Sequence, residues 1–366
     1  MSYLVESPIT GGKFVKYRIE NGTRIICDNA FKGCSEMREV IIPPTVNFIG
    51  DNAFADCSSL NTIELPESIV YIGNRAFDFN GDNNHTIRMV LPSSIGYIDG
   101  NPFSNNCKIA SKSSKYIVND NVLYSSDMTR LLSYCNQQDS FSIPRGVKVI
   151  GKDAFRGSNL KSIDFPNTVE IIECNAFEGN SFPVLKLPTS LKSISKHAFS
   201  WCKIGCLEIP SMINFLDDKK ERLKYLYPET ECNLLKVPKN SINYFKELFS
   251  GQEIYTIIEE DFIFENNMFL NKDKTELVST FVQETNQNYY IPNGVVRIRD
   301  NALLYICGWE RNIHLPKSLK HISKNAFGAS AENFDGDLFV PKGKIEEYNI
   351  LFPELRNHIF EESGMK

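Results

Sequence analysis

The chain has 366 residues, of which 42% are hydrophobic and 23% are charged, and its formal net charge is -5. This composition is typical of a folded protein with a sizeable core, and the slight acidic excess gives no basic field of the kind that attracts nucleic acid. No run approaches the roughly 18 apolar residues that a membrane-spanning helix needs. The first residues also lack a basic segment followed by an apolar one, so the sequence as given predicts neither a membrane span nor a signal peptide.

An Ala-Phe pair recurs along the chain, beginning with Phe31, Phe54 and Phe77, which are spaced by 23 residues. The pair, or a degenerate copy of it, returns at Phe103, Phe155, Phe177, Phe199, Leu303 and Phe327. An apolar residue followed by proline alternates with this pair, at Pro43, Pro66, Pro92, Pro144, Pro166, Pro188, Pro210, Pro292 and Pro316. Two markers that keep step over units of roughly 22 to 26 residues predict a repeat solenoid, in which each coil packs on its neighbours.

Residues 57–77 show how one coil is built. Ile63 and Leu65 alternate with polar neighbours, which is the pattern of a strand with one buried face. Pro66 ends that strand, because proline cannot donate a hydrogen bond to a neighbouring strand. The following segment, as far as Gly73, is predicted to be a short return turn that delivers the next Ala-Phe pair to the interior.

The markers divide the chain into five expected segments of different character. These are a repeat array at 1–115, a β-hairpin insert at 116–142, a second array with an irregular stretch and a helical cap at 143–261, a second β-hairpin at 262–290, and final repeats with another helical cap at 291–366.

The hairpins are predicted because residues 121–133 match residues 267–279 at a constant offset, with apolar residues on both sides of a polar centre. The caps are predicted at residues 237–249 and 340–352, which share a Val-Pro-Lys start followed by a short helical pattern. Ser241 is the expected N-cap of the first cap helix. A helix at these places would close the exposed end of a β-solenoid.

The ten cysteines fit the repeat frame better than a disulfide framework, which suits short secreted chains. Cys34, Cys57 and Cys202 each lie three residues after the repeat Phe, where other coils carry Ser158 or Asn180. We therefore expect a buried stack of free thiols and hydroxyls. No C-x-x-C pair or His-x-x-x-His spacing accompanies them, so the sequence predicts no metal site and no cofactor.

Two further polar patterns favour structural roles. The Asn that precedes Ala-Phe in several coils is expected to bond the local backbone at a turn. Asp78, Asn80, Asp82 and Asn84 alternate as calcium ligands do, but Asn83 replaces the glycine and Met89 the bidentate glutamate of a calcium loop. We interpret this stretch as extra residues in a surface turn.

The combined motif resembles the BspA-like branch of leucine-rich repeats. It consists of an apolar-Pro step, an Ile-Gly-x-x-Ala-Phe segment and a Cys-x-x-Leu-x-x-Ile restart, as in residues 57–77 and 143–155. The resemblance extends from about Ile19 to Glu362, while residues 211–236 and 245–262 depart from the pattern. It implies a β-rich, curved, right-handed solenoid with inserted hairpins and short capping helices. Known members are commonly bacterial surface or secreted proteins that bind host or matrix proteins, and some occur in parasitic protists; the family shares no catalytic residues.

The sequence contains no motif of a serine hydrolase, phosphate-binding loop, zinc protease or dinucleotide-binding enzyme. The leading hypothesis is therefore a non-catalytic protein that binds protein or glycan outside the cell or at its surface. An intracellular scaffold is the first alternative, and an enzyme is the second. A signal peptide upstream of Met1 in the genomic reading frame would favour the first of these over an intracellular scaffold.

The candidate binding residues alternate with the buried positions of the strands, so they should face solvent as a column of mixed charge. They are Glu39, Thr62, Glu64, Arg88, Asp164, Lys186, Glu208 and His314. Trp201 and Trp309 follow the repeat Phe position in turns where other coils have small residues, so they are candidate aromatic anchors. The alternative is that the column is ordinary solvated surface and that the tryptophans pack on irregular neighbours.

Overall fold

The structure is a computed structural model, and its contacts divide the chain into two compact units. It describes residues 2–4, 15–79, 86–105, 107–195, 197–210, 231–248, 256–282, 288–306, 311–328 and 334–362. Unit 1 comprises Met1–Ser181, Pro188–Cys202 and Ile213–Thr230, and unit 2 comprises Phe182–Leu187, Lys203–Met212 and Glu231–Lys366. Both are built from stacked coils with mainly parallel strands, so the predicted β-solenoid is confirmed.

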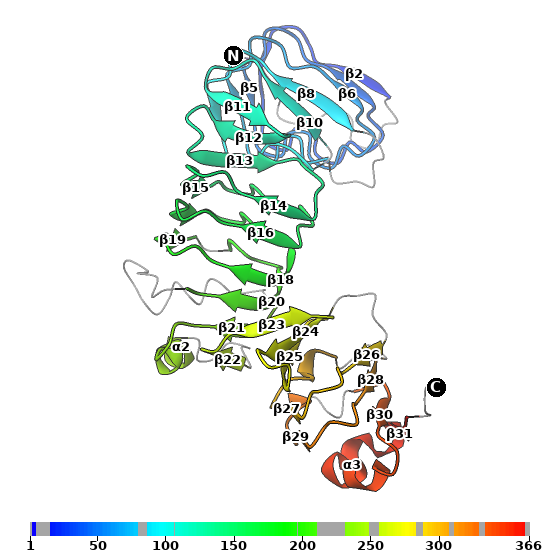
Figure 1. The fold of residues 1–366 in the computed structure, drawn as a ribbon. Helices are drawn as coiled ribbons and strands as arrows, with labels where there is room; N and C mark the ends of the chain where they lie inside the picture. Colours follow the sequence, from blue (N-terminus) through cyan, green and yellow to red (C-terminus); the bar gives the residue numbers. More distant parts are fainter. Residues whose placement is uncertain are drawn as a thin grey trace. The chain divides into compact units, whose positions relative to one another are not determined.

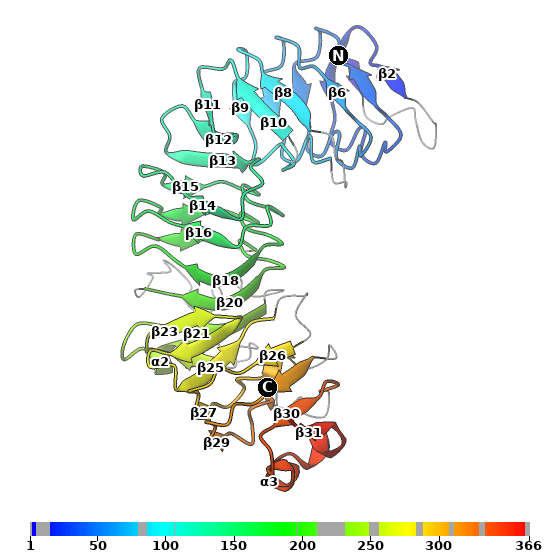
Figure 2. The same cartoon turned by 45° about the vertical axis from the view of Figure 1, so that its right-hand side comes forward.

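Most coils contribute a strand just before the apolar-Pro marker, and we call these strands, with the strands that pair with them in the same sheet, the proline-side strands. In unit 1 these strands form three parallel groups. They are β2 (Lys16–Arg18), β4 (Glu39–Ile41) and β6 (Thr62–Ile63), then β8 (Ile87–Leu91) with β10 (Cys107–Ser111), and β14 (Ser140–Ser142) with β16 (Ser162–Asp164). Figure 2 shows β8 and β10 side by side in cyan.

The segment expected to be only a return turn is also a strand, which we call the return strand. The return strands are short, often of two residues, and they pair in parallel with the return strands of neighbouring coils. In unit 1 one row begins with β1 (Ser2–Leu4) and continues with the return strands β3 (Thr23–Ile26), β5 (Phe48–Ile49), β7 (Tyr71–Ile72) and β9 (Tyr97–Ile98). A second row contains β15 (Val149–Ile150), β17 (Ile171–Ile172) and β19 (Ser193–Ile194). The predicted turns are present, at residues 67–68 and 74–76 in the coil that carries β7, but the strand between them was not predicted because two residues are too few to show alternation.

Both predicted hairpins are confirmed. In unit 1, β11 (Tyr116–Asn119), β12 (Val122–Ser125) and β13 (Arg130–Tyr134) form an antiparallel meander, and β13 then pairs in parallel with β15. In unit 2, β23 (Phe262–Glu265), β24 (Met268–Asn271) and β25 (Glu276–Thr280) repeat this arrangement and lead into the return strands β27 (Arg297–Ile298) and β29 (His321–Ile322). Each hairpin thus restarts a row of return strands.

The remaining strands of unit 2 form two sheets on the proline side. One contains β18 (Ser181–Lys186), β20 (Lys203–Glu208), β21 (Glu231–Lys236) and β22 (Thr256–Ile258). The other contains β26 (Asn288–Tyr290), β28 (Asn312–His314), β30 (Leu338–Val340) and β31 (Ile359–Glu361). The described helices are short: α2 (Ile242–Leu248), α3 (Ile345–Leu351) and the 3-10 turns η1 (Leu304–Ile306) and η3 (Pro353–His358).

The repeat phenylalanines form the core of the coils. The rings of Phe31 and Phe54 stack with centroids 5.0 Å apart at an angle of 4°, and those of Phe177 and Phe199 stack 5.3 Å apart at 6°. All four side chains are at most 1% exposed. Burying a side chain of this size stabilises the fold by about 1.5 to 3 kcal/mol relative to leaving it in water, and the stacking aligns successive coils.

The cysteine position after the repeat Phe has a specific hydrogen-bonding role. The thiol of Cys57 donates to the carbonyl oxygen of Phe31, 3.1 Å away, in the preceding coil. The side-chain amide of Asn180 donates in the same way to Phe155, at 2.7 Å. Each of these buried carbonyls also accepts from a local backbone N–H, that of Cys34 or Ser158, so the small side-chain donor adds a second hydrogen bond that links neighbouring coils, which explains why Cys and Asn replace one another there.

At four positions the Asn before Ala-Phe has a different role from the one expected. Asn29, Asn52, Asn175 and Asn301 have φ between 53° and 59°, the left-handed region. Asparagine tolerates this region better than most residues. The predicted bond to local backbone is found at Asn101, whose side-chain oxygen accepts from the N–H of Phe103 at 3.0 Å, whereas the other four positions have a conformational reason for asparagine.

The first capping helix, α2, is present, but the predicted N-cap is wrong. The hydroxyl of Ser241 donates to the carbonyl oxygen of Pro238. The carboxylate of Glu259 instead accepts from the backbone N–H groups of Ser241 and Ile242, at 2.8 and 3.0 Å. A carboxylate from the neighbouring strand segment thus satisfies the free amides at the start of this helix, and hydrogen bonds from the backbone N–H groups of Asn240 first, then Ile242 and Ser241, lower the pKa of Glu259.

Candidate functional site

The predicted column residues of unit 1 lie on the solvent side of the proline-side strands. Thr62, Glu64, Arg88 and Asp164 are exposed, and Glu39 is half-buried in an ion pair with Lys16 at 2.7 Å. Register places Glu39 beside Thr62 in the sheet. Their alternation with buried residues holds, whereas their role in binding stays a prediction.

One proline-side sheet of unit 2 carries two further predicted residues, Lys186 and Glu208. Lys186 is exposed, and Glu208 is half-buried beside Lys236, whose Nζ is 3.5 Å from the Glu208 carboxylate. Lys236 also pairs with Asp261 at 2.7 Å and lies 5.5 Å from the centre of the Phe262 ring. Here the outward face is a network of matched charges.

On the other proline-side sheet of unit 2 the column is aromatic. Tyr290, His314, Phe339 and Phe360 occupy successive outward positions on β26, β28, β30 and β31. The ring centroids are separated by 4.2, 4.5 and 6.0 Å in that order, and the first two pairs are stacked within 15°. We call these four residues the aromatic ladder.

The ladder is accessible to solvent. Tyr290 is 51% exposed and Phe360 is 43% exposed, while His314 and Phe339 are half-buried between them. The Nδ1 of His314 donates to a carboxylate oxygen of Glu362, 2.6 Å away. An exposed apolar strip on an open sheet face is unusual for a solvated surface and is typical of a contact site.

Sequence reasoning identified only His314 of this ladder. Tyr290 and Phe339 stand directly before Ile291-Pro292 and Val340-Pro341, as His314 stands before its own apolar-Pro marker. Superposing every marker would therefore have found both residues. Phe360 has no such marker, and its place in the ladder follows only from the pairing of β30 with β31.

A polar column runs beside the ladder. The side-chain amide of Asn312 donates to the side-chain oxygen of Asn288 at 3.1 Å, and Asn312 in turn accepts from the backbone N–H of Asp337 at 3.0 Å. His358 lies 3.6 Å from the Asp337 carboxylate. This face therefore combines an apolar strip with amide and acidic groups.

Trp201 is 64% exposed and has φ of 57°, so it is both solvent-facing and left-handed. Gly33, Gly157 and Gly179 occupy the same turn position with φ between 58° and 76°. A bulky residue is disfavoured there by about 1 to 2 kcal/mol. Because the indole is exposed, its burial offsets little of this cost. Trp309 lies outside the described residues.

The return strands of unit 1 carry an aromatic column that sequence reasoning missed. Phe48, Tyr71 and Tyr97 occupy one register position on β5, β7 and β9. The rings of Phe48 and Tyr71 stack at 4.2 Å, and those of Tyr71 and Tyr97 at 5.7 Å. Burial, and next the carboxylate of Asp99, raise the pKa of Tyr71 to about 12.

Two cavities lie where a hairpin joins the return strands. Their places in the chain are equivalent, because the hairpin residues 121–133 and 267–279 match at an offset of 146 residues. The first, in unit 1, has a volume of about 630 Å³ and is lined by Tyr97, Lys115, Asp127, Arg130, Lys152 and Glu173, among others. The second, in unit 2, has a volume of about 810 Å³ and is lined by Lys246, Glu276, Arg297, Arg299, Asp300 and His321, among others. We call them the Tyr97 cavity and the Arg297 cavity.

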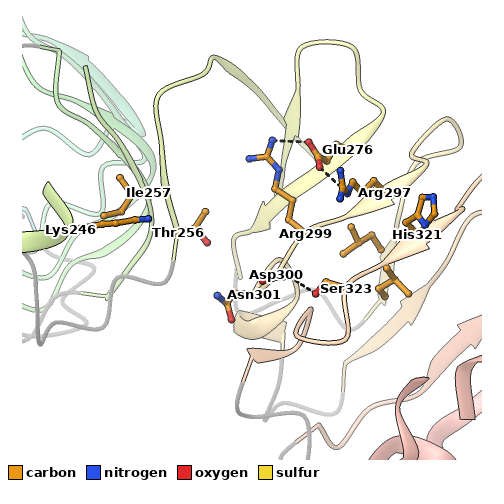
Figure 3. Close-up of a pocket in the computed structure, with 12 residues that line it drawn as sticks. Lys246, Thr256, Ile257, Glu276, Arg297, Arg299, Asp300, Asn301, His321 and Ser323 are labelled. Atoms are coloured by element: carbon orange, nitrogen blue, oxygen red, sulfur yellow. Dashed lines mark hydrogen bonds and ion pairs between the residues drawn. The ribbon is translucent and has the colours of Figure 1, made fainter. Parts of the chain in front are cut away.

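Figure 3 shows the Arg297 cavity, with Lys246 reaching from α2 toward the strands. Arg299 pairs with Glu276 at 2.7 Å and with Glu260 at 2.6 Å. Arg297 lies 3.6 Å from the same Glu276 carboxylate. Most of the charge in this cavity is therefore already compensated within the protein.

Two structural findings concern metals and membranes. Asp78, the first residue of the calcium-like pattern, accepts from Arg75 and Arg156 at 3.1 and 3.0 Å, and residues 80–85 lie outside the described part of the chain. Among the described residues no group of three or more His, Cys, Asp or Glu side chains is placed to hold a metal ion. No helix in the described ranges is long and apolar enough to cross a membrane.

The comparisons with known proteins agree with the coil geometry. The family profile of the BspA type leucine-rich repeat region matches residues 10–129, 129–219, 148–277 and 275–335. The chain belongs to this family. No curated protein matched the chain.

Several solved structures are similar to this chain at low identity. A leucine-rich repeat protein from Eubacterium ventriosum is 20% identical, with a TM-score of 0.46 over 86% of this chain and 82% of that one. The pneumococcal vaccine antigen PcpA is 20% identical, with a TM-score of 0.44 over 71% of this chain and 85% of that one. A leucine-rich repeat protein from Bacteroides ovatus is 18% identical, with a TM-score of 0.37 over 95% and 84%.

Proposed function

We propose that this chain is a non-catalytic binding protein of the cell surface and that it holds a protein partner on the aromatic ladder. The ladder is the observation that carries the proposal. Four aromatic side chains at successive outward positions form one apolar strip on an open sheet, and aromatic residues dominate the energy of protein interfaces. The surface location rests on the commonest location of the family's members.

The geometry of the ladder favours protein over glycan at this surface. Sugars stack on the faces of aromatic rings, but the faces of His314 are covered by Tyr290 and Phe339. The central rings His314 and Phe339 therefore present their edges, which carry partial positive charge and suit aliphatic or aromatic side chains in edge-to-face contact, whereas the end rings Tyr290 and Phe360 each keep one face that no ladder ring covers.

The surroundings define the chemistry of the partner. Asp337, Glu361 and Glu362 give the rim of the ladder a negative charge, and the Asn288–Asn312 pair adds amide groups. We expect a protein with an apolar centre and a basic rim, since complementary charge at the rim speeds association and selects partners. The four strands span about 14 Å, three intervals of about 4.8 Å, enough for one helix or strand of a partner.

The test is capture from cell-surface and matrix extracts, followed by measurement of the dissociation constant for each captured protein. Tyr290→Ala and Phe339→Ala should each weaken binding at least tenfold, about 1.4 kcal/mol. Ile350→Ala is the matched control, because Ile350 is 80% exposed on α3 and lies outside the ladder.

Two further variants address the other candidate surfaces. One reverses the charges of Glu64, Asp164 and Glu208 to Lys, and the other is Trp201→Ala. If a partner survives both ladder variants and is lost with either of these, the ladder is the wrong surface.

A further inference from the structure

We propose that the Tyr97 cavity binds a neutral sugar unit of a glycan. This goes beyond the proposed function, because the cavity lies in unit 1, apart from the ladder's strands, and takes a ligand of a different chemical class. Its volume of about 630 Å³ is within the range of small-molecule sites, roughly 300 to 1,000 Å³.

An aromatic face is available in this cavity. Tyr97 is the last ring of the column on the return strands, and β9 is the last strand of its sheet. One face of the ring stacks on Tyr71, yet Tyr97 is 57% exposed and lines the cavity. We infer that the second face is turned to the cavity, where it can stack against the C–H groups of a pyranose ring, because the face of an aromatic ring is negative and the C–H groups are weakly positive.

Four of the six charged side chains around Tyr97 form ion pairs. Arg130 and Glu173 form an ion pair at 2.8 Å, and Lys152 and Asp99 approach to 3.8 Å. The lining contains three cationic side chains, Lys115, Arg130 and Lys152, and three carboxylates, Asp99, Asp127 and Glu173. The numbers of cationic and anionic side chains in the lining are equal, so a neutral ligand meets no net charge, and a ligand charge at Arg130 or Lys152 would compete with an existing ion pair.

The same groups can still hydrogen-bond hydroxyls. Arg130 donates one bond to Glu173, and a guanidinium has five N–H donors. Lys115 donates from Nζ to the carbonyl oxygen of Gly96 at 3.1 Å, and an ammonium has three donors. Hydrogen bonds to charged groups are about twice as strong as those between neutral groups. The cavity therefore offers a polyhydroxylated ring an aromatic face on one side and charged donors and acceptors around its hydroxyl groups.

The Arg297 cavity provides an internal comparison. It occupies the equivalent place after the second hairpin, since Glu276 matches Arg130 at the offset of 146 residues. Its lining has no Tyr, Trp or Phe among the described residues. The side chains that share one register position on β25, β27 and β29 beside it are those of Glu276, Arg297 and His321. We therefore expect no sugar in this cavity.

The experiment is saturation-transfer NMR of the full chain with a panel of neutral di- and trisaccharides built from glucose, galactose, mannose and N-acetylhexosamines. At least one should bind. For that sugar, Tyr97→Ala should weaken binding at least tenfold, Tyr97→Phe should stay within about threefold because the ring remains, and Arg297→Ala should have no effect. Thermal unfolding of each variant checks that the coil is intact.

Three results would overturn the proposal: no sugar of the panel binds, binding survives Tyr97→Ala, or only charged saccharides or peptides bind in a Tyr97-dependent way. Failure here is distinguishable from failure of the proposed function, because Tyr97→Ala should leave capture on the ladder unchanged. Likewise, Phe339→Ala should leave sugar binding unchanged.

Discussion

The imidazole of His314 lies parallel to the ring of Phe339, with centroids 4.5 Å apart and an angle of 5° between the planes. Tyr290 covers the opposite face of the same imidazole at 4.2 Å, and Glu362 accepts from its Nδ1 at 2.6 Å. These contacts hold the exposed side chains in one arrangement. A surface ordered in this way loses little side-chain entropy when a partner binds, which favours affinity.

The first prediction concerns the stability of the ladder. His314→Ala removes two stacking contacts and a hydrogen bond, so it should lower the free energy of unfolding by about 1 to 2 kcal/mol, measured by urea unfolding. His314→Phe retains the stacking and should cost less than half as much. His358→Ala is the control, because His358 lies on the same face, outside the ladder, and forms an exposed pair with Asp337 at 3.6 Å, so its loss should cost under about 0.5 kcal/mol. Equal losses for His314→Ala and His358→Ala would show that the ladder is not cohesive.

The second prediction concerns Trp201, which is exposed and left-handed. Glycine adopts its φ of 57° without strain, so Trp201→Gly should leave the melting temperature unchanged or raise stability by up to about 1 kcal/mol. If Trp201 is a contact residue, the same variant loses a partner while gaining stability. A drop in stability of more than about 1 kcal/mol would instead mean that the indole packs on its own coil.

Much of the fold follows from the sequence because its signals are local and repeated. The Ala-Phe pair and the apolar-Pro step each mark one point of every coil, and the alternation of Ile63 and Leu65 with polar residues marks the proline-side strand. The hairpins were predictable for the same reason. Glu259, by contrast, caps α2 from 17 residues further along the chain, a distance over which sequence patterns carry no signal.

The candidate sites were harder to predict because they depend on neighbouring coils. Tyr71 belongs to a strand of two residues, and its column with Phe48 and Tyr97 exists only after the coils are stacked. Tyr290 and Phe339 were missed because the residues before their apolar-Pro markers were not aligned with His314, whereas Phe360 has no marker and its alignment follows only from the pairing of strands. Cys57 was placed correctly as a buried free thiol, although its hydrogen bond to Phe31 could not be foreseen.

The third prediction concerns thiol reactivity. The nine described cysteines are thiols outside any disulfide, and six of them are buried: Cys57, Cys107, Cys135, Cys202, Cys206 and Cys232. In the native protein these six should react with a thiol reagent far more slowly than the half-buried Cys27, Cys34 and Cys174. Denaturation should bring the titre, with Cys307 included, close to the ten cysteines of the sequence. Several disulfides in the denatured, unreduced protein would contradict the thiol stack.

The fourth prediction concerns alkaline pH. Burial raises the pKa of Cys107 to about 11 and that of Cys202 to about 12, from an ordinary value near 9. Above pH 9 the unfolded chain therefore loses these protons while the folded chain keeps them. Stability is full below pH 9 and should fall by about 1.4 kcal/mol per pH unit for each such thiol until its folded pKa is reached.

The measurement is the free energy of unfolding between pH 8 and 10.5 in the presence of a reductant. Cys202→Ser is the control, because a serine hydroxyl can still donate to the carbonyl of Phe177 but does not ionise in this range. Its pH dependence should be shallower than that of the wild type. Identical slopes would exclude Cys202 as a source of the alkaline loss.

The last prediction compares two glycines that are needed for different reasons. A Cβ at Gly73 would lie 2.6 Å from backbone atoms of Gly50 and Asp51 and 2.4 Å from the Asp51 carboxylate, which accepts from the N–H of Asn74 at 2.8 Å. Gly73→Ala must therefore push two coils apart and should destabilise the protein by about 3 kcal/mol or more. Gly33 has a φ of 76° with nothing within 4 Å of its Cβ position, so Gly33→Ala should cost only backbone strain, about 1 to 2 kcal/mol. Chemical unfolding of both variants tests the difference, and a Gly73→Ala cost no larger than that of Gly33→Ala would mean that the coils can separate locally without loss of packing.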